Sequence, residues 1–296
     1  MDNTKQLGSA PVGKLLFQLA LPAIAAQIVN ILYNIVDRIY IGHIPDVGSA
    51  ALTGVGVTFP VLMIISAFSA LVGMGGAPLA SIKMGENNME GAQKILGNAT
   101  VLLLIVSAVL TAVFLIFDQP ILYTFGASKD TIGYAMQYMT IYVCGTVFVQ
   151  IALGLNAFIT AQGAAKTSMM TVLIGAVINI VLDPIFIFGL NMGVRGAALA
   201  TVIAQGVSAV WVLCYLLGKR TKLRISPRYF GLDWKVISGI TALGVSPFIM
   251  QSTESLLNVV FNTSLLKYGG DVAVGAMTIL ASLMQIMSMP IMGLTQ

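Results

Sequence analysis

The stretch Ser168–Leu190, SMMTVLIGAVINIVLDPIFIFGL, contains a single charged residue, Asp183. A helix of about 20 mostly apolar residues crosses the hydrocarbon core of a bilayer, which is about 30 Å thick. This stretch therefore predicts a transmembrane helix. A carboxylate inside such a helix costs about 2.5–3.5 kcal/mol on insertion scales, so it is expected to face a partner or a cavity rather than lipid. The same stretch thus indicates a membrane fold and a candidate functional site.

Similar apolar runs fill the rest of the chain. Of the 296 residues 57% are hydrophobic and only 9% are charged, against roughly 25% charged residues in soluble proteins. This composition excludes a water-soluble domain and a disordered chain. Two cysteines, Cys144 and Cys214, give neither a disulfide framework nor a metal-ligand spacing. We expect an all-α polytopic membrane bundle whose other spans are Leu15–Gly42, Ala50–Ile82, Ile95–Phe117, Ile132–Thr160, Ala197–Gly218, Val236–Leu265 and Val272–Gln296.

Basic residues fall mainly on one side of the predicted membrane. The chain carries 15 Lys and Arg against 11 Asp and Glu, a net charge of +4. With the N-terminus in the cytoplasm, the inner loops hold eleven basic residues and the outer loops hold three, Lys129, Arg195 and Lys267. Because Lys and Arg collect in cytoplasmic loops, the N-terminus is predicted to lie inside. The basic stretch Lys219–Lys235 is then a cytoplasmic linker near lipid headgroups rather than a nucleic-acid site.

The first two runs recur later in the chain as the seventh and eighth. Six spans separate the copies, so both enter the membrane from the same side, as in the parallel repeats of secondary transporters. We expect residues 1–218 to form an N-terminal lobe of six helices, 219–235 a basic linker and 236–296 the start of a second lobe. The repeat further predicts twelve spans in a complete protein, of which this chain is a fragment with eight. Residues matched at an offset of 225 include Pro22 with Pro247, Leu32 with Leu257, Asp46 with Asp271 and Thr53 with Thr278.

Three carboxylates lie within predicted spans: Asp37, Asp183 and Glu254. At about 1.5 Å per residue, counted from the basic residue that precedes each span, all three fall in the outer half of the membrane, in one layer. Asn179 is four residues before Asp183 and shares its helical face. Thr201 follows the outer start of the next run and lies at a compatible depth. We therefore predict an oxygen-rich cluster of Asp37, Asn179, Asp183 and Thr201.

Such a cluster suits either of two coupling ions. Hard oxygen ligands can bind Na⁺, and a buried carboxylate can instead hold a proton. No cofactor other than the coupling ion is expected. Arg38 is the only basic residue in a span, and residues at i and i+1 point in different directions, so a bridge to Asp37 has poor geometry. We expect Arg38 to extend toward the outer surface rather than pair with a carboxylate. Pro184 is expected to bend its helix beside Asp183.

Two stretches carry a resemblance to a known family. Residues 34–43, NIVDRIYIGH, and 179–189, NIVLDPIFIFG, resemble the multidrug and toxic compound extrusion (MATE) family of cation-coupled efflux transporters. The resemblance covers essentially the whole chain, as the N-terminal lobe and the first two helices of the C-terminal lobe. It implies that Asp37, Asn179, Asp183 and Thr201 form the cation or proton site of that lobe.

The same resemblance suggests further candidate residues outside this cluster. Glu254, with Gln251 one turn before it, resembles a seventh-helix position used for coupling or substrate contact in one branch of the family. Asn34, which opens the first matching stretch, is a further candidate for such a contact.

Taken together, these observations predict a transporter and not an enzyme. The expected activity is antiport of amphipathic, often cationic, drugs and toxic organic compounds against Na⁺ or H⁺, across the inner (cytoplasmic) membrane. We expect the lipid bilayer and small organic molecules as partners, and a monomer when the chain is complete. One alternative is a lipid-linked precursor flippase of the same superfamily, although phosphate-bearing cargo calls for a more cationic cavity. Another is an intramembrane aspartyl protease, although neither Asp37 nor Asp183 follows Gly-x-Gly.

Overall fold

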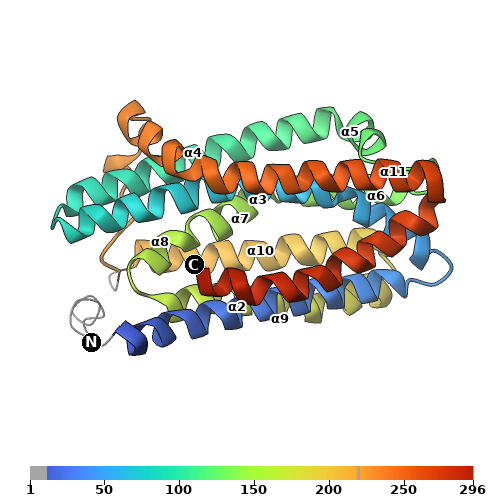
Figure 1. The fold of residues 1–296 in the computed structure, drawn as a ribbon, viewed down its shortest axis with the longest axis horizontal. Coiled ribbons are helices and arrows are strands. Elements are labelled where there is room, and N and C mark those ends of the chain that lie inside the picture. Colours follow the sequence, from blue (N-terminus) through green and yellow to red (C-terminus); the bar gives the residue numbers. More distant parts are fainter. Residues whose placement is uncertain (1–11, 219–220, 296) are drawn as a thin grey trace.

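The protein is a bundle of long α-helices (Figure 1). This computed structural model describes the backbone of residues 12–218 and 221–295, and the side chains of 20–218, 221–281, 283 and 284. This part of the chain contains no β-strand. The long elements are α2 (Val12–Gly42), α3 (Gly48–Gly85), α4 (Met89–Ile116), α9 (Ala165–Pro184) with the π-helical η2 (Ile185–Gly189), α10 (Val194–Leu217) and α11 (Trp234–Thr295).

Six helices of the described chain are long and apolar enough to cross a membrane, and a bent pair makes a seventh candidate. The predicted polytopic helix bundle is therefore confirmed. The bent pair is the predicted fourth span, and α11 contains the predicted seventh and eighth. The shorter elements are α5 (Asp118–Thr124), α6 (Ile132–Cys144), α7 (Thr146–Val149), η1 (Gln150–Gly154), α8 (Asn156–Ala161) and η3 (Pro227–Tyr229).

The predicted fourth span is broken near its middle. Its two halves meet at Gly145 with a bend of 57°, and a π-helical turn, η1, follows the break. Side chains satisfy backbone groups around the bend: the Thr111 hydroxyl donates to the Val143 carbonyl (3.1 Å), and the Gln150 amide donates to the Ile65 carbonyl (3.0 Å). Because these acceptors are met by protein groups, the break is tolerated at membrane depth.

The last described helix, α11, doubles back on itself. Gly270 has φ 65° and ψ −169°, values that are open to glycine, and the chain reverses there with only this one non-helical residue. Figure 1 shows the first half of α11 starting from the same end of the bundle as α2, and the second half returning toward that end, as α3 does. The arrangement agrees with the parallel repeat predicted from sequence.

Tight helix packing joins α11 to the N-terminal helices. A Cβ atom at Gly244 would clash with the Leu71 carbonyl, and one at Gly75 would clash with the Ile240 carbonyl. Missing side chains therefore let the first half of α11 approach the α3 backbone closely, as small residues do in other membrane bundles. The Ser255 hydroxyl adds a buried hydrogen bond to the Pro60 carbonyl (2.9 Å).

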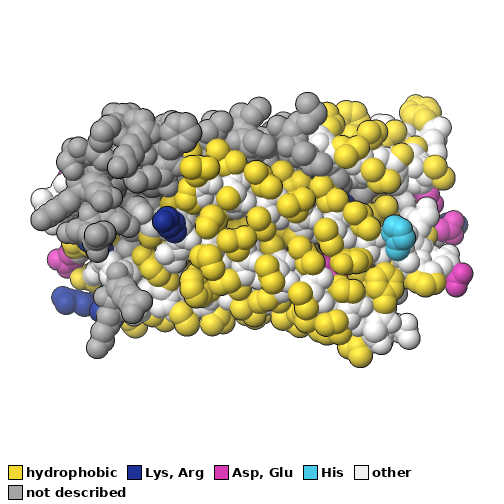
Figure 2. All heavy atoms as spheres, turned by 90° about the horizontal axis from the view of Figure 1, so that it is seen from below, with side chains coloured by type: hydrophobic (Ala, Val, Ile, Leu, Met, Phe, Trp, Pro, Cys, Tyr) yellow, Lys and Arg dark blue, Asp and Glu magenta, His cyan; other side chains and the backbone are white. Residues whose placement is uncertain are grey.

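Charged residues gather at the two ends of the bundle, and apolar side chains cover the face between them (Figure 2). We call the end at which α2 begins the basic end, and the other the opposite end. Large apolar side chains such as Val109, Val181 and Val210 are more than half exposed, as expected for lipid-facing positions. The described basic-end cations are Lys83, Lys94, Lys166, Lys222, Arg224, Arg228 and Lys235.

The linker between α10 and α11 folds onto the basic end. Gln162 accepts from the Thr221 hydroxyl (2.6 Å) and from the backbone N–H of Leu223 (2.9 Å), and the Leu223 side chain is buried. Nearer α11, Asp233 pairs with Lys94, and this hydrogen bond holds the pKa of the Asp233 carboxyl below its ordinary value. The start of α11 is thereby fixed against the N-terminal helices.

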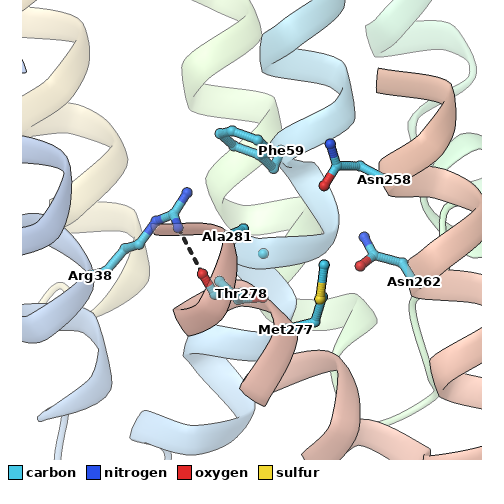
Figure 3. A pocket seen from close by; sticks show the side chains of 8 residues that line it. Arg38, Phe59, Asn258, Asn262, Met277, Thr278 and Ala281 are labelled. Atoms are coloured by element: carbon cyan, nitrogen blue, oxygen red, sulfur yellow. Dashed lines mark hydrogen bonds between the residues drawn. The ribbon is translucent and has the colours of Figure 1, made fainter. Parts of the chain in front are cut away.

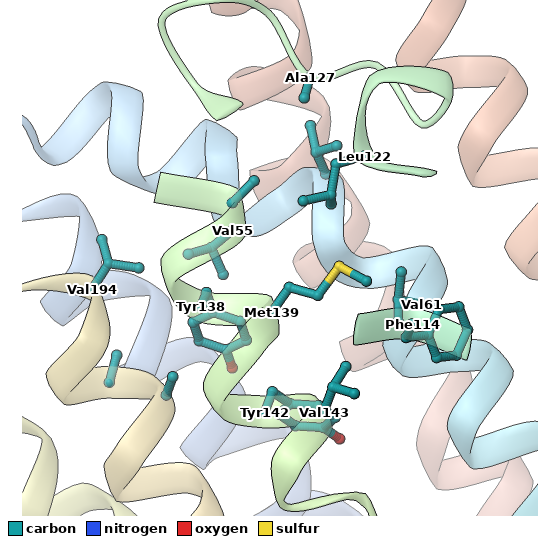
Figure 4. Close-up of a cluster of buried hydrophobic side chains, with 14 of the residues drawn as sticks. Val55, Val61, Phe114, Leu122, Ala127, Tyr138, Met139, Tyr142, Val143 and Val194 are labelled. Atoms are coloured by element: carbon teal, nitrogen blue, oxygen red, sulfur yellow. The ribbon is translucent and has the colours of Figure 1, made fainter. Parts of the chain in front are cut away.

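Two buried apolar clusters hold the helices together, one toward each end. In the cluster nearer the opposite end, shown in Figure 4, one face of α6 packs against α3, α4 and α10. Burial of each large apolar side chain typically contributes about 1.5–3 kcal/mol relative to water; within lipid, close packing supplies the stabilisation instead. The labelled residues are Val55, Val61, Phe114, Leu122, Ala127, Tyr138, Met139, Tyr142, Val143 and Val194.

Candidate cation site

Asp183 occupies the last turn of α9 and is fully buried. Pro184 follows it, and because proline has no backbone N–H, the regular helix cannot continue unchanged. The chain instead enters the π-helical turn η2, Ile185–Gly189. Isolated π-helical turns occur frequently at functional sites. The bend expected at Pro184 is thus a local change of helix type that begins directly after the carboxylate.

Asn179 joins Asp183 to α10. The Asn179 amide nitrogen donates to Asp183 Oδ1 (3.1 Å) and to Thr201 Oγ1 (3.3 Å). The Thr201 hydroxyl donates in turn to the Ala197 carbonyl of its own helix (3.0 Å). The four-residue spacing between Asn179 and Asp183 therefore places both side chains on one face of α9, as predicted, and that face meets Thr201.

Asp37 reaches the same place from α2. Its side chain is 8% exposed, and its carboxyl lies within hydrogen-bonding reach of the Asp183 carboxyl. Two ionised carboxylates have only acceptor oxygens, so they cannot bond to each other unless a proton or a cation lies between them. The structure therefore brings together all four predicted cluster residues, from α2, α9 and α10.

Several oxygens in this cluster have no partner. The buried atoms Asp37 Oδ1, Asn179 Oδ1 and Asp183 Oδ2 accept no hydrogen bond from the described residues. Buried polar atoms are rarely left unpaired, because each costs about 1–3 kcal/mol. Carboxylate and amide oxygens are the ligands that hard cations prefer. The donor set thus fits Na⁺ or a shared proton, whereas the described residues contain no group of three His, Cys, Asp or Glu suited to a transition metal.

Tyrosines line the cluster, and the sequence argument missed them. Tyr138 of α6 is buried, its hydroxyl lies within hydrogen-bonding reach of Thr201, and its ring stacks on Tyr142 with centroids 6.1 Å apart. Tyr33 of α2 lies close enough to Asp37 and Asp183 to feel their charge. The spacing of Tyr138 and Tyr142 was an available signal, because a buried tyrosine hydroxyl usually requires a polar partner.

Arg38 does not extend to the outer surface, and that prediction is wrong. Its guanidinium donates to the Thr278 carbonyl on the returning half of α11 (2.9 Å) and lies over the Phe59 ring (5.2 Å to the centroid). Figure 3 shows this contact at the edge of a small pocket between α2, α3 and α11, into which Asn258 and Asn262 also point. Arg38 is held there because α11 supplies an acceptor and α3 an aromatic face within its reach.

The remaining candidates lie away from the cluster. Glu254 is exposed on the first half of α11, so the shared layer with Asp37 and Asp183 does not produce contact. Gln251, one turn earlier, is half-buried on the same helix. The Asn34 amide donates to the Asn30 carbonyl of its own helix (2.7 Å). These three residues remain candidates for substrate contact only.

The fold and the carboxylate cluster together define a polytopic membrane protein with a buried cation or proton site. Comparison with known proteins identifies the family: residues 22–185 match the MatE family model, and the chain belongs to that family, the multidrug and toxic compound extrusion family. Its members are efflux transporters rather than enzymes, so the protease alternative is excluded.

Individual relatives match over nearly the whole chain. The multidrug export protein MepA of Staphylococcus haemolyticus is 27% identical over 283 residues, which cover 96% of this chain and 62% of the relative. The Staphylococcus aureus (strain COL) protein of the same name is 26% identical over 97% of this chain and 63% of its own length. This chain therefore spans less than two thirds of the length of these relatives.

Solved structures agree with the fold. The MATE multidrug transporter DinF-BH, solved as a complex with a small molecule, superimposes with a TM-score of 0.92 at 36% identity, over 97% of this chain and 64% of that one. A MOP superfamily transporter from Pyrococcus furiosus, described as having reverse polarity of its binding pocket, gives 0.86 at 28% identity, over 98% of this chain and 64% of that one.

Proposed function

We propose that the protein exports amphipathic, often cationic, drugs and toxic organic compounds across the cytoplasmic membrane in exchange for Na⁺ or H⁺. The observation that carries the proposal is the pair Asp37 and Asp183, whose carboxyls meet inside the bundle with unpartnered oxygens. Such a pair requires a proton or a cation, and the ion that binds there changes the charge of the site. Export by the related MepA proteins supports the cargo direction.

The proposed arrangement follows the predicted domains. Residues 1–218 form the N-terminal lobe, 219–235 the cytoplasmic linker and 236–296 the first hairpin of the second lobe of a protein that acts as a monomer. The eleven basic residues predicted on one side support a cytoplasmic N-terminus. The basic end of the bundle is then cytoplasmic and the opposite end faces outward.

Coupling would operate through α2. Asp37 contributes to the ion site, and its neighbour Arg38 holds the returning half of α11 through the Thr278 carbonyl. An ion that draws Asp37 and Asp183 together shifts α2, and with it the contact between the two lobes. An ion can move this equilibrium only by its difference in affinity for the two arrangements. Competition between ion and cargo follows if the cargo favours the arrangement that the ion disfavours.

Contacts near the opposite end join the two lobes and must open if cargo leaves there. The Ser128 hydroxyl donates to Asp271 Oδ2 (2.8 Å), and the Thr263 hydroxyl donates to the Thr124 carbonyl (3.2 Å). We expect cysteines at Ser128 and Asp271 of the complete protein, joined by a short bifunctional thiol reagent, to stop export reversibly. Dye efflux before and after cleavage of the crosslink checks this, with Cys144 and Cys214 first replaced by serine.

A crosslink within one lobe serves as the control. Ser128 Oγ lies 3.1 Å from Thr131 Oγ1 in the same loop region, so a cysteine pair at these positions should crosslink without loss of export. Complete crosslinking of the Ser128 and Asp271 pair with undiminished efflux would show that these contacts need not separate during transport.

The proposed function itself is tested in pump-deficient cells that express the complete protein. We expect efflux of a lipophilic cationic dye that stops when one ion gradient is collapsed: a Na⁺ ionophore for Na⁺ coupling, or a protonophore for H⁺ coupling. Efflux that survives collapse of both gradients would contradict cation coupling, and the absence of dye efflux from expressing cells would contradict the cargo class.

A further inference from the structure

The carboxylate cluster lies much closer to one end of its helix than to the other. Asp183 is 18 residues beyond Ala165, where α9 begins, and six residues before Gly189, where η2 ends. At about 1.5 Å per residue the two distances are about 27 Å and about 9 Å. An ion that enters from the opposite end therefore has a short way in and a long way to the basic end.

Polar side chains mark this longer route. Along α9 the positions 168, 171, 175, 179 and 183 follow one another at intervals of three or four residues and so share a helical face. They carry Ser168, Thr171, Gly175, Asn179 and Asp183. Polar groups inside a membrane bundle are costly and face the interior or water. The face runs from the carboxylate cluster to within one turn of the loop before α9.

Hydrogen bonds connect this face to α8 and α10 in its basic-end half. The Thr171 hydroxyl donates to Asn156 Oδ1 (3.0 Å), and the Asn156 amide donates to Ser168 Oγ (2.8 Å). The Thr160 hydroxyl donates to the same Ser168 oxygen (2.9 Å). Thr160 is exposed, so the series ends at the surface of the bundle, three residues before the turn at Gly163.

One helical turn separates this network from the cluster. On α10 the Ser208 hydroxyl donates to the Thr171 carbonyl (3.0 Å), and a Cβ atom at Gly175 would come within 2.6 Å of Ser208 Oγ. Glycine at position 175 thus leaves the Ser208 oxygen uncovered on the side that faces Asn179. The next polar group along the face, Asn179, is one turn of about 5.4 Å away, a gap that one or two water molecules can bridge.

From this placement we infer that Ser208, Thr171, Asn156, Ser168 and Thr160 form a polar track along which the coupling ion leaves the Asp183 site for the cytoplasm. The ion, as Na⁺ or as an excess proton on water, moves along water molecules held by these oxygens, so no covalent bond to protein is made or broken. The inference rests on the proposed cation coupling and adds the inward route, which the carboxylate cluster alone does not define.

The test uses the complete protein in proteoliposomes with two readouts. One is the rate of dye transport driven by the ion gradient, and the other is the rise in melting temperature that the ion causes when it binds. Thr171→Val and Ser208→Ala should each lower the transport rate at least fivefold while the ion-induced rise in melting temperature persists. Thr100→Val is the matched control, because this buried threonine of α4 bonds only within its helix, to the Leu96 carbonyl (2.8 Å), and lies outside the track.

Each result decides between the models. Wild-type transport rates in both track variants would overturn the inference and leave cation coupling intact. Loss of the ion-induced rise together with transport would also overturn it, because the residues would then belong to the binding site. A wild-type protein without any ion-driven transport would remove the proposed function and the track together.

Discussion

Replacing Asp183 by asparagine in the complete protein should abolish export, with dye accumulation in expressing cells returning to that of pump-deficient cells. Asparagine keeps the shape of the side chain but cannot be ionised, so the pair with Asp37 no longer needs or attracts a cation. The amide nitrogen would in addition face Asn179, which already donates to Asp183 Oδ1. We expect at least a tenfold loss of efflux rate, and a similar loss for Asp37→Asn.

A carboxylate outside the cluster provides the matched control for this substitution. Asp130→Asn changes an exposed aspartate between α5 and α6 and should leave efflux unchanged. The amount of each variant in the membrane, and its melting temperature in detergent, separate loss of transport from loss of folding. If Asp183→Asn and Asp37→Asn were both folded and pumped at the full rate, the site assignment would be wrong.

The second large effect concerns stability. Gly75→Val and Gly244→Val should each disrupt the seam between α3 and the first half of α11, because even a Cβ atom at either position meets a backbone carbonyl that cannot rotate away. Overpacking of this kind costs about 1–3 kcal/mol, and more where backbone must move. The expected result is a lower melting temperature and less folded protein in the membrane.

Gly133→Ala is the corresponding control, because a Cβ atom at this glycine of α6 has nothing within 4 Å. Alanine is favoured over glycine in a helix interior by about 1 kcal/mol in water, so we expect an unchanged or slightly higher melting temperature. Wild-type melting of both valine variants would mean that α11 does not pack against α3 as described.

Much of the fold follows from the sequence because the bilayer imposes a fixed length on each span. The apolar run that contains Asp183 predicts α9 and η2 closely, and the proline after the carboxylate predicts a local change in the helix. The bend at Gly145 was not predicted. Its apolar residues read as one continuous span, and the hydrogen bonds that stabilise the break come from α3 and α4, which are distant in sequence.

The candidate site was predictable where its members share one helix or neighbouring helices. Asn179 and Asp183 are four residues apart, and Thr201 lies just inside the next helix, so spacing and depth suffice. Contacts between distant segments were not accessible in this way. Arg38 meets the carbonyl of a residue 240 positions later, and Glu254 shares the predicted depth of Asp37 and Asp183 but not their face of the bundle.

Simultaneous measurement of ion and drug movement tests the central claim most directly. The complete protein is placed in proteoliposomes with a gradient of a lipophilic cationic drug and no ion gradient, and Na⁺ and H⁺ movements are recorded separately. We predict that the drug gradient drives one of these ions in the opposite direction, and that Asp183→Asn eliminates this movement. Drug movement at the wild-type rate without any accompanying Na⁺ or H⁺ flux would contradict the account.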